Sequence, residues 1–197
     1  ASAGYYVSTT AATSQTACAA GTYQPSTAQT SCIDADAGYY VASAGSTSQT
    51  ACVAGTYQPS IAQTSCIDAS AGYYVDTTAA TSQTACPAGT YNPNTGSTDS
   101  SACIEAAEGY YVPNAGSASQ TACSLGTYQS DEGQTSCDEA DAGYYVDTMA
   151  ATDQTACDPG TYQPDTGQSS CIDASAGYYV DTMAATDQTA CDPGTYQ

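Results

Sequence analysis

Residues 18–32, CAAGTYQPSTAQTSC, are the stretch around which the whole sequence is organised. The same pattern of a cysteine, Gly-Thr-Tyr, a polar loop and a second cysteine returns in residues 52–66, 86–103, 123–137 and 157–171, and a further copy begins at Cys191. The spacer between copies repeats as well. We therefore interpret the sequence as an array of small modules rather than as one large domain.

The array has a period of 34 residues, because the cysteines are separated alternately by 14 and 20 residues. A single separation of 17 makes the third repeat 37 residues long. We place its three extra residues around residues 92–96, where Pro, Gly and Asn are typical of a surface turn. The predicted divisions are a partial repeat at 1–17, repeats at 18–51, 52–85, 86–122 (with the insertion), 123–156 and 157–190, and a partial repeat at 191–197.

Each repeat divides into a short half bounded by cysteines and a long half that contains Ala-Gly-Tyr-Tyr-Val. Both halves contain Gly, a Tyr two residues later, a polar loop, and Gln-Thr before a small residue and Cys. The Tyr, Val and Thr residues favour a short strand, Gln-Thr-Ala-Cys is its expected partner, and the residues between them favour a turn. We predict small disulfide-rich all-β repeats, built of short hairpins stacked as an elongated rod, with little or no helix.

The composition does not suit an ordinary hydrophobic core. The chain has no Trp and no Phe, and its hydrophobic 41% is mostly Ala, Tyr and Cys. Since burial contributes only about 25 cal/mol per Å² of apolar surface, Ala-rich packing alone stabilises such a chain weakly. We expect the eleven cysteines to compensate, as disulfides do in small secreted domains.

The charge of the chain is entirely negative, with 20 acidic residues and no Lys, Arg or His. Nucleic acid is therefore an implausible partner. Without His or Lys the usual bases for nucleophilic catalysis are missing, so we expect no enzyme, no catalytic residue and no cofactor. Carboxylates do cluster, but without the spacing of an EF-hand loop, and Asp36 is replaced by Ser70 one repeat later. We therefore expect no metal site.

The setting indicated by the sequence is extracellular, either at a cell surface or secreted. Regularly spaced cysteines are typical of oxidising compartments, and a chain that is about a quarter Ser and Thr suits O-glycosylation at positions the sequence does not specify. No apolar run reaches the length of a membrane-spanning helix, and no signal peptide is recognised. Because the chain starts and ends inside a repeat, we expect a window on a longer array.

The order C-x-x-G-x-Y, a polar loop and then C resembles the ephrin-receptor-like and TNF-receptor-like cysteine-rich repeats of extracellular proteins. The resemblance covers the whole chain. In that family the repeat reads C-x-x-C-x-x-G-x-Y, a loop and C-x-x-C, so this chain lacks two cysteines in each long half. In one long half Ala35 and Gln49 occupy their positions. The same paired absence recurs at Ala69 with Gln83, Ala106 with Gln120, Ala140 with Gln154, and Ala174 with Gln188.

The resemblance implies that whole disulfides have been lost and that the remaining cysteines pair within each short half. The implied pairs are Cys18–Cys32, Cys52–Cys66, Cys86–Cys103, Cys123–Cys137 and Cys157–Cys171, with Cys191 joined to a residue beyond Gln197. The residues alone leave open a second register in which Cys32 pairs with Cys52. The shorter loop favours the first register, and each such bond contributes about 3 kcal/mol in the chain-entropy model.

Without a disulfide, each long half is predicted to be held by its Tyr-Tyr pair. Adjacent tyrosines on a strand face opposite ways, so one packs inward and the other faces solvent or the next module. A sugar-stacking platform is the alternative interpretation of these side chains. The tyrosines concerned are Tyr5, Tyr6, Tyr39, Tyr40, Tyr73, Tyr74, Tyr110, Tyr111, Tyr144, Tyr145, Tyr178 and Tyr179.

The function favoured by the sequence is structural: an extracellular fibre, stalk or surface filament, with glycans on Ser and Thr and with adjacent repeats of the same chain or filament as its partners. One alternative is a receptor or adhesin ectodomain that binds a protein or glycan, for which the insertion is the best candidate surface. The other alternative is a secreted acidic calcium-binding protein.

Overall fold

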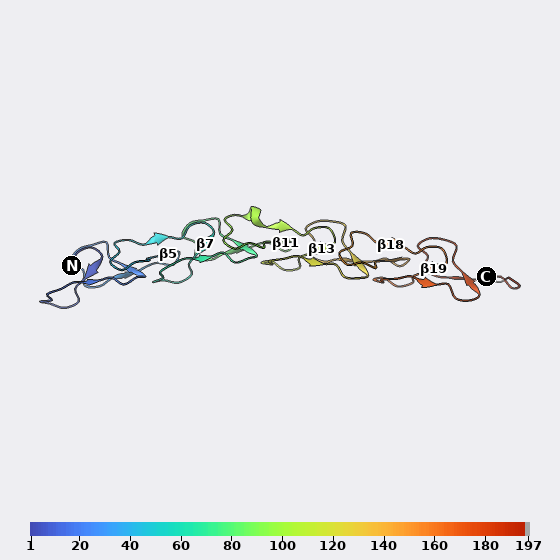
Figure 1. Cartoon of the computed structure of the whole chain (residues 1–197), viewed down its shortest axis with the longest axis horizontal. Coiled ribbons are helices and arrows are strands. Elements are labelled where there is room, and N and C mark those ends of the chain that lie inside the picture. Colours follow the sequence, from blue (N-terminus) through green and yellow to red (C-terminus); the bar gives the residue numbers. More distant parts are fainter. Residues whose placement is uncertain (196–197) are drawn as a thin grey trace. The chain divides into compact units, whose positions relative to one another are not determined.

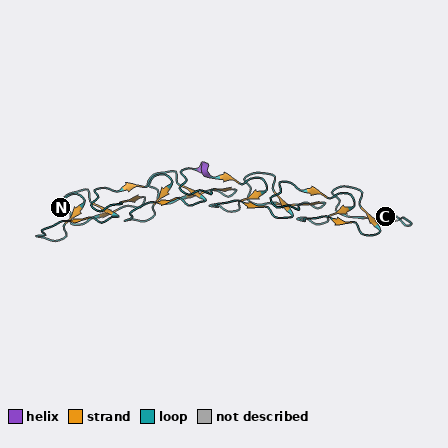
Figure 2. Cartoon of the chain, in the orientation of Figure 1, coloured by secondary structure: helices purple, strands orange, loops and turns teal. Residues whose placement is uncertain are grey.

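The computed structural model describes residues 1–195. The chain forms two compact units, one made of Ala1–Cys86 with Asn92–Cys103 and the other of Pro87–Tyr91 with the residues from Ile104 onward. Both units are built from antiparallel two-stranded hairpins that follow one another in chain order (Figure 1). Loops and turns make up most of each hairpin, and the strands are two residues long (Figure 2).

Each 34-residue repeat contains two hairpins. The short-half hairpin ends on the two residues that follow the second cysteine, and the other hairpin lies in the long half. The short halves form β3 (Thr22–Tyr23) with β4 (Ile33–Asp34), β7 (Thr56–Tyr57) with β8 (Ile67–Asp68), β11 (Thr90–Tyr91) with β12 (Ile104–Glu105), β15 (Thr127–Tyr128) with β16 (Asp138–Glu139), and β19 (Thr161–Tyr162) with β20 (Ile172–Asp173). The long halves form β1 (Tyr5–Tyr6) with β2 (Thr16–Ala17), β5 (Tyr39–Tyr40) with β6 (Thr50–Ala51), β9 (Tyr73–Tyr74) with β10 (Thr84–Ala85), β13 (Tyr110–Tyr111) with β14 (Thr121–Ala122), β17 (Tyr144–Tyr145) with β18 (Thr155–Ala156), and β21 (Tyr178–Tyr179) with β22 (Thr189–Ala190).

These hairpins confirm the predicted fold class of small disulfide-rich all-β repeats. The Tyr-Tyr strand pairs with Gln-Thr-Ala as expected, with Tyr5 opposite Ala17 and Tyr6 opposite Thr16 in the first hairpin. Within residues 1–195 the structure contains a single short 3-10 helix, η1 (Ser100–Ala102). No helix in that range has the length and apolar character that crossing a membrane requires.

Successive hairpins within each unit are joined by a repeated set of backbone hydrogen bonds. In the hairpin of β5 and β6, the Gly38 N–H donates to Gln58 O at 2.7 Å and the Val41 N–H donates to Gln63 O at 3.0 Å. The next hairpin donates in return, from the Ala62 N–H to Ala35 O at 2.8 Å. Because backbone atoms carry these contacts, short and long halves dock in the same way although their side chains differ.

A second kind of contact, between hairpins of the same unit, joins a hairpin to the hairpin after the next. The loop of every hairpin contains a residue with positive φ, which is Gly at some positions and Ala at others, as at Ala79 with φ 54°. The carbonyl of Ala79 lies against Gly38, where a Cβ would be only 2.2 Å from the oxygen. Gly38 itself has φ 84°. Glycine is therefore required at this position for two independent reasons, its dihedral angle and the close approach of a loop.

The buried residues form a thin line rather than a broad core. Fully buried positions are the first cysteine of each short half, such as Cys18, and the alanine at the same place in the long half, such as Ala35. The other buried positions are the glycine at the start of the hairpin, such as Gly38, and Val41 in a long half or Gln24 in a short half, the last two exposed by 2% and 4%. Several large apolar side chains, including Val53 and Leu125, remain exposed. The limited burial agrees with the expectation that cross-links replace apolar packing.

The insertion of the third repeat lies later in the chain than we predicted. Asn92 is not part of a surface turn: it is fully buried, at the place that Gln24 occupies in the first repeat. Gly96 also keeps the regular frame, since its N–H donates to Ala69 O at 2.8 Å like the equivalent loop residues. The extra length is accommodated after Gly96, where η1 is capped by Asp99. Because the docking contacts hold the first part of the loop in place, the extra residues are accommodated in the segment between Gly96 and Cys103.

Candidate functional site

Five disulfides close the short-half loops. The structure joins Cys18 to Cys32 and Cys86 to Cys103, and the other three pairs are Cys52–Cys66, Cys123–Cys137 and Cys157–Cys171. These are the pairs that the family resemblance implies, and the register that joins Cys32 to Cys52 does not occur. The Cα–Cα distances are 5.6–5.8 Å. Cys191 is half-buried and forms no disulfide with the described residues; its predicted partner lies outside them.

A buried amide side chain forms hydrogen bonds with the backbone inside each disulfide loop. Gln24 Nε2 donates to Ser31 O at 2.9 Å, and Gln24 Oε1 accepts from the Ser26 N–H at 3.0 Å. Gln58, Gln129 and Gln163 make the same two hydrogen bonds in their own loops. Both polar ends of the side chain are thus satisfied, which removes the penalty of burying an amide. The recurring Gly-Thr-Tyr-Gln sequence offered this signal, but sequence reasoning did not use it.

In each long half a glutamine hydrogen bond occupies the place of the missing disulfide. Gln49 stands where the second cysteine would be, and its Oε1 accepts from the N–H of Asp36 at 2.7 Å, next to Ala35. The same bond runs from Ser70 to Gln83, from Ala107 to Gln120, from Asp141 to Gln154 and from Ser175 to Gln188, at 2.6–2.8 Å. We call this hydrogen bond the glutamine clamp. It holds the two ends of the long-half loop, a role that we had assigned to the tyrosine pair alone.

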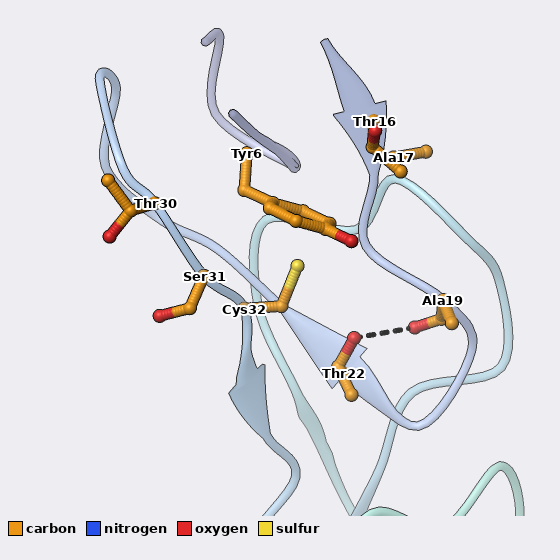
Figure 3. A pocket seen from close by; sticks show the side chains of 8 residues that line it. All are labelled: Tyr6, Thr16, Ala17, Ala19, Thr22, Thr30, Ser31 and Cys32. Atoms are coloured by element: carbon orange, nitrogen blue, oxygen red, sulfur yellow. Dashed lines mark hydrogen bonds between the residues drawn. The ribbon is translucent and has the colours of Figure 1, made fainter. Parts of the chain in front are cut away.

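The two tyrosines of each long half have different surroundings. The hydroxyl of Tyr5 lies 3.6 Å from the place of a Cβ on Gly45, in the loop of the hairpin after the next. Tyr6 instead lies beside Cys32 of the following hairpin, and Figure 3 shows the cysteine sulfur directed toward its ring. Ten of the twelve predicted packing tyrosines, from Tyr5 to Tyr145, are half-buried, while Tyr178 and Tyr179 are exposed.

A pocket beside the disulfide recurs from repeat to repeat. The first has a volume of about 440 Å³ and is lined by Tyr6, Thr16, Ala17, Ala19, Thr22, Thr30, Ser31 and Cys32 (Figure 3). Equivalent residues line pockets at Tyr40 with Cys66, at Tyr111 with Cys137 and at Tyr145 with Cys171, with volumes of about 300, 260 and 460 Å³. Each therefore combines a tyrosine ring, a disulfide sulfur and several hydroxyl-bearing residues.

The acidic residues are spread over the surface. Among residues 1–195 no group of three or more Asp, Glu, Cys or His side chains could hold a metal ion. The Ser101 hydroxyl and backbone N–H donate to Asp99, and these bonds lower the pKa of its carboxyl below the usual value. Burial, together with the negative charges of Asp141, Asp138 and Asp153, raises the pKa of Tyr128. Neither group belongs to a cluster with a catalytic arrangement.

Comparison with known proteins gives one family match. The family described as tyrosine-protein kinase ephrin type A/B receptor-like matches residues 38–86, 109–157 and 143–191, which together cover more than half of the chain. No curated protein matches the chain. The matched stretches contain hairpins of both halves, with their glutamine clamps and the disulfides Cys52–Cys66 and Cys123–Cys137. The cysteine-rich repeats are thus of an extracellular type, and the chain belongs to the ephrin type A/B receptor-like family.

Proposed function

We propose that the chain is a structural extracellular repeat protein, a segment of a fibre, stalk or surface filament. The observation that supports this proposal is the uniform docking of hairpins within each unit. Gly38, for example, donates to the next hairpin at Gln58 and receives the Ala79 carbonyl of the hairpin after it. Each added hairpin repeats these contacts, so a chain of this kind gains length without needing new kinds of interface.

The surface chemistry suits a structural role better than a catalytic one. The sequence has no Lys or His to act as a base, and the hydroxyls of Thr22, Thr56 and Thr161 donate to nearby backbone carbonyls at 2.8 Å. No repeat carries a strongly distinctive surface, since the insertion adds only the polar turn η1. These features favour the structural role over an enzyme and over a receptor that recognises one partner through one repeat.

A glycan coat is part of the proposal. The short-half loop from residue 25 to residue 31 is exposed along its whole length and contains two Ser and two Thr residues. Hydroxyl-rich exposed loops of this kind are suitable acceptors for O-linked sugars, which hydrate and protect extended extracellular proteins. The partners of the chain are then its own adjacent repeats and covalently attached glycans.

The test of the structural role is how size grows with chain length. The whole chain and its tandem dimer and trimer, oxidised to form the disulfides, are compared by small-angle scattering and by imaging. A fibre or stalk predicts that the maximum dimension rises in proportion to the number of copies. Growth of the radius of gyration with roughly the 0.38 power of chain length, as in compact domains, would contradict the proposal.

A further inference from the structure

We propose that the pocket beside each disulfide is a binding site for the ring of a neutral sugar. The site, which we call the tyrosine pocket, consists of the second tyrosine of a long half, the second cysteine of the following short half and the hydroxyl-bearing residues around them. In the first repeat these are Tyr6, Cys32, Thr16 and Thr22. The inference is independent of the filament proposal, because the pocket is made within two adjacent hairpins.

The floor and rim of the pocket have complementary chemistry. A tyrosine ring presents an apolar face, on which the C–H groups of a sugar ring stack, and a hydroxyl at its edge. Small-molecule sites combine such apolar surface with a few fixed polar groups. The pocket at Tyr6 has this combination, since Ala17 and Ala19 line it together with the ring, and Thr16, Thr22 and Thr30 lie around it (Figure 3).

One rim hydroxyl has a fixed orientation in every copy. Thr22 Oγ1 donates its proton to Ala19 O at 2.8 Å, so the lone pairs of the same oxygen remain available to accept a hydrogen bond. The equivalent threonines make the same bond in the other pockets, from Thr56 to Val53 O, from Thr127 to Ser124 O and from Thr161 to Asp158 O, each at 2.8 Å. A preoriented acceptor suits a ligand rich in O–H donors, which is the character of a sugar.

The charge pattern indicates that the ligand is neutral. The chain has a formal net charge of -20 and no Lys, Arg or His, so no pocket offers a cationic side chain to pair with an anionic ligand. A cation would need a carboxylate in the pocket, yet the pockets of Tyr6, Tyr40 and Tyr111 are lined by none. Only the pocket of Tyr145 has aspartates, Asp147 and Asp158, at its edge. The features shared by all four pockets are the ring, the sulfur and the hydroxyls.

Repetition of the pocket favours a sugar polymer over a single sugar. The four pockets occur at equivalent places in different repeats of one chain. Individually shallow sites bind weakly, but several sites on one chain that engage one polymer raise the apparent affinity by roughly 100-fold or more when the geometry allows simultaneous contact. A neutral polysaccharide, or the glycans carried by the chain itself, are the two sources of such rings.

The experiment uses the whole oxidised chain made without glycans. It is titrated with methyl glycosides of neutral hexoses and with a neutral hexose polymer, while NMR follows the tyrosine ring signals and saturation transfer to the sugar. We expect the signals of Tyr6, Tyr40, Tyr111 and Tyr145 to shift and the polymer to bind more tightly than the monomer. The proposal would be overturned if the tyrosine signals did not change when sugar is added. It would also be overturned if the chain bound only choline, a sulfated polysaccharide or a proline-rich peptide.

Matched variants locate the site. A variant in which the four pocket tyrosines are changed to Ser should bind the polymer about ten-fold or more weakly; these are Tyr6, Tyr40, Tyr111 and Tyr145. The control variant changes the preceding tyrosine of each pair to Ser, and its affinity for the polymer should stay within about two-fold of the unchanged chain; these are Tyr5, Tyr39, Tyr110 and Tyr144. If the variant of the pocket tyrosines does not fold, Thr22→Val with Thr56→Val, Thr127→Val and Thr161→Val removes the acceptors while keeping side-chain size. Unchanged affinity in the folded variant would refute the assignment.

Native glycosylated material distinguishes the two sources of the sugar. If the glycans of the chain fill the pockets, added glycoside does not bind, and magnetisation transfers between glycan protons and the ring of Tyr6. If the ligand is external, the native chain binds the polymer as the unglycosylated chain does. Native material that shows neither binding nor contacts between glycan and ring would count against the proposal even if the bare chain binds weakly.

Discussion

At the scale of single residues, Gly38 shows most clearly what the fold demands of its sequence. Its φ of 84° and the nearby carbonyl of Ala79 both exclude a side chain. Gly177 has the same dihedral requirement, with φ 86°, but an added Cβ there would meet nothing within 4 Å. Replacing Gly177 by alanine therefore costs only the strain of a side chain at positive φ, whereas replacing Gly38 also displaces a loop.

We predict that Gly38→Ala destabilises the chain more than Gly177→Ala does. Gly177→Ala should lower the free energy of unfolding by about 1–2 kcal/mol, the cost of a side chain at positive φ. Gly38→Ala should cost in addition at least roughly 1–3 kcal/mol, because the loop that contains Ala79 must move. Denaturant unfolding of the two variants measures the difference. Equal losses would mean that the contact between alternate hairpins contributes little.

Asp99 gives a prediction about pH. The Ser101 hydroxyl and N–H hold the pKa of the Asp99 carboxyl below its usual value of about 3.9. A lowered folded-state pKa means that the stabilisation is present above the unfolded-state pKa and is lost as the pH falls through the folded-state pKa. The Ser101 amide signal should therefore shift in NMR spectra below about pH 4. Asp99→Asn keeps the acceptor without the titration, so a similar shift in that variant would point to another group.

Residue-scale features were only partly predictable from the sequence. A glycine that recurs before each Tyr-Tyr pair is a local signal for positive φ, because glycine is the residue that tolerates this conformation most readily. Ala28 and Ala79 also have positive φ, 58° and 54°, and nothing in an alanine signals this conformation. It follows from docking of the loop on two earlier hairpins, a tertiary requirement that local patterns do not contain. The position of the insertion was misjudged for the same reason.

At the scale of the hairpin, the disulfide and the glutamine clamp are two solutions to one problem. Cys18 and Cys32 are 14 residues apart, and Ala35 and Gln49 are 14 residues apart at the equivalent places. The covalent bond contributes about 3 kcal/mol by restricting the unfolded chain. A hydrogen bond contributes only about 1 kcal/mol. The long-half hairpins should therefore be the first to open.

We predict that the clamp and the disulfide can be exchanged. Ala35→Cys combined with Gln49→Cys should form a disulfide and raise the free energy of unfolding by roughly 2 kcal/mol, the difference between the two kinds of link. Gln49→Ala alone should lower it by about 1 kcal/mol, because the Asp36 N–H loses its acceptor. Peptide mass mapping detects the new bond, and thermal unfolding measures the stability. A double variant that keeps two free thiols would show that the halves differ in backbone geometry.

The sequence predicted the hairpins but not the clamp. The Tyr-Tyr strand and its Gln-Thr-Ala partner were sufficient to place the long-half strands, since each feature is local. The second strand of each short-half hairpin, such as Ile33–Asp34, follows the second cysteine and was not predicted. The sequence shows that Ala35 and Gln49 together replace the two cysteines of the family pattern, but our prediction gave the task of holding the long half to the tyrosine pair and no specific role to Gln49. Its specific acceptor role depends on the loop bringing Asp36 beside it, which only the folded hairpin shows.

At the scale of the whole molecule, the one-sided charge should influence stability most in the second unit. The first unit contains five acidic residues and the second contains fifteen, and neither has a side-chain cation. Repulsion among carboxylates opposes the compact state. Salt at about 1 M shortens the Debye length to about 3 Å and screens this repulsion.

We predict that added sodium chloride stabilises the second unit more than the first. Amide hydrogen exchange, measured at low salt and at about 1 M salt, should slow by a larger factor in residues 104–195 than in residues 1–86. The first unit is the internal control, because non-ionic effects of salt act on both. Equal slowing would indicate that charge repulsion does not limit stability.

The contact between the Ala79 carbonyl and Gly38 also gives the chain a direction of assembly. A loop docks on hairpins that precede it, so during synthesis the residues on which it docks are already present when the loop appears. Each new hairpin then brings the acceptors that the preceding hairpin still lacks, such as Gln58 O for the Gly38 N–H, so the array can be completed from the N-terminus one hairpin at a time. For a protein with so little apolar core, this order spares the chain from having to collapse as a whole before any part of it is stable.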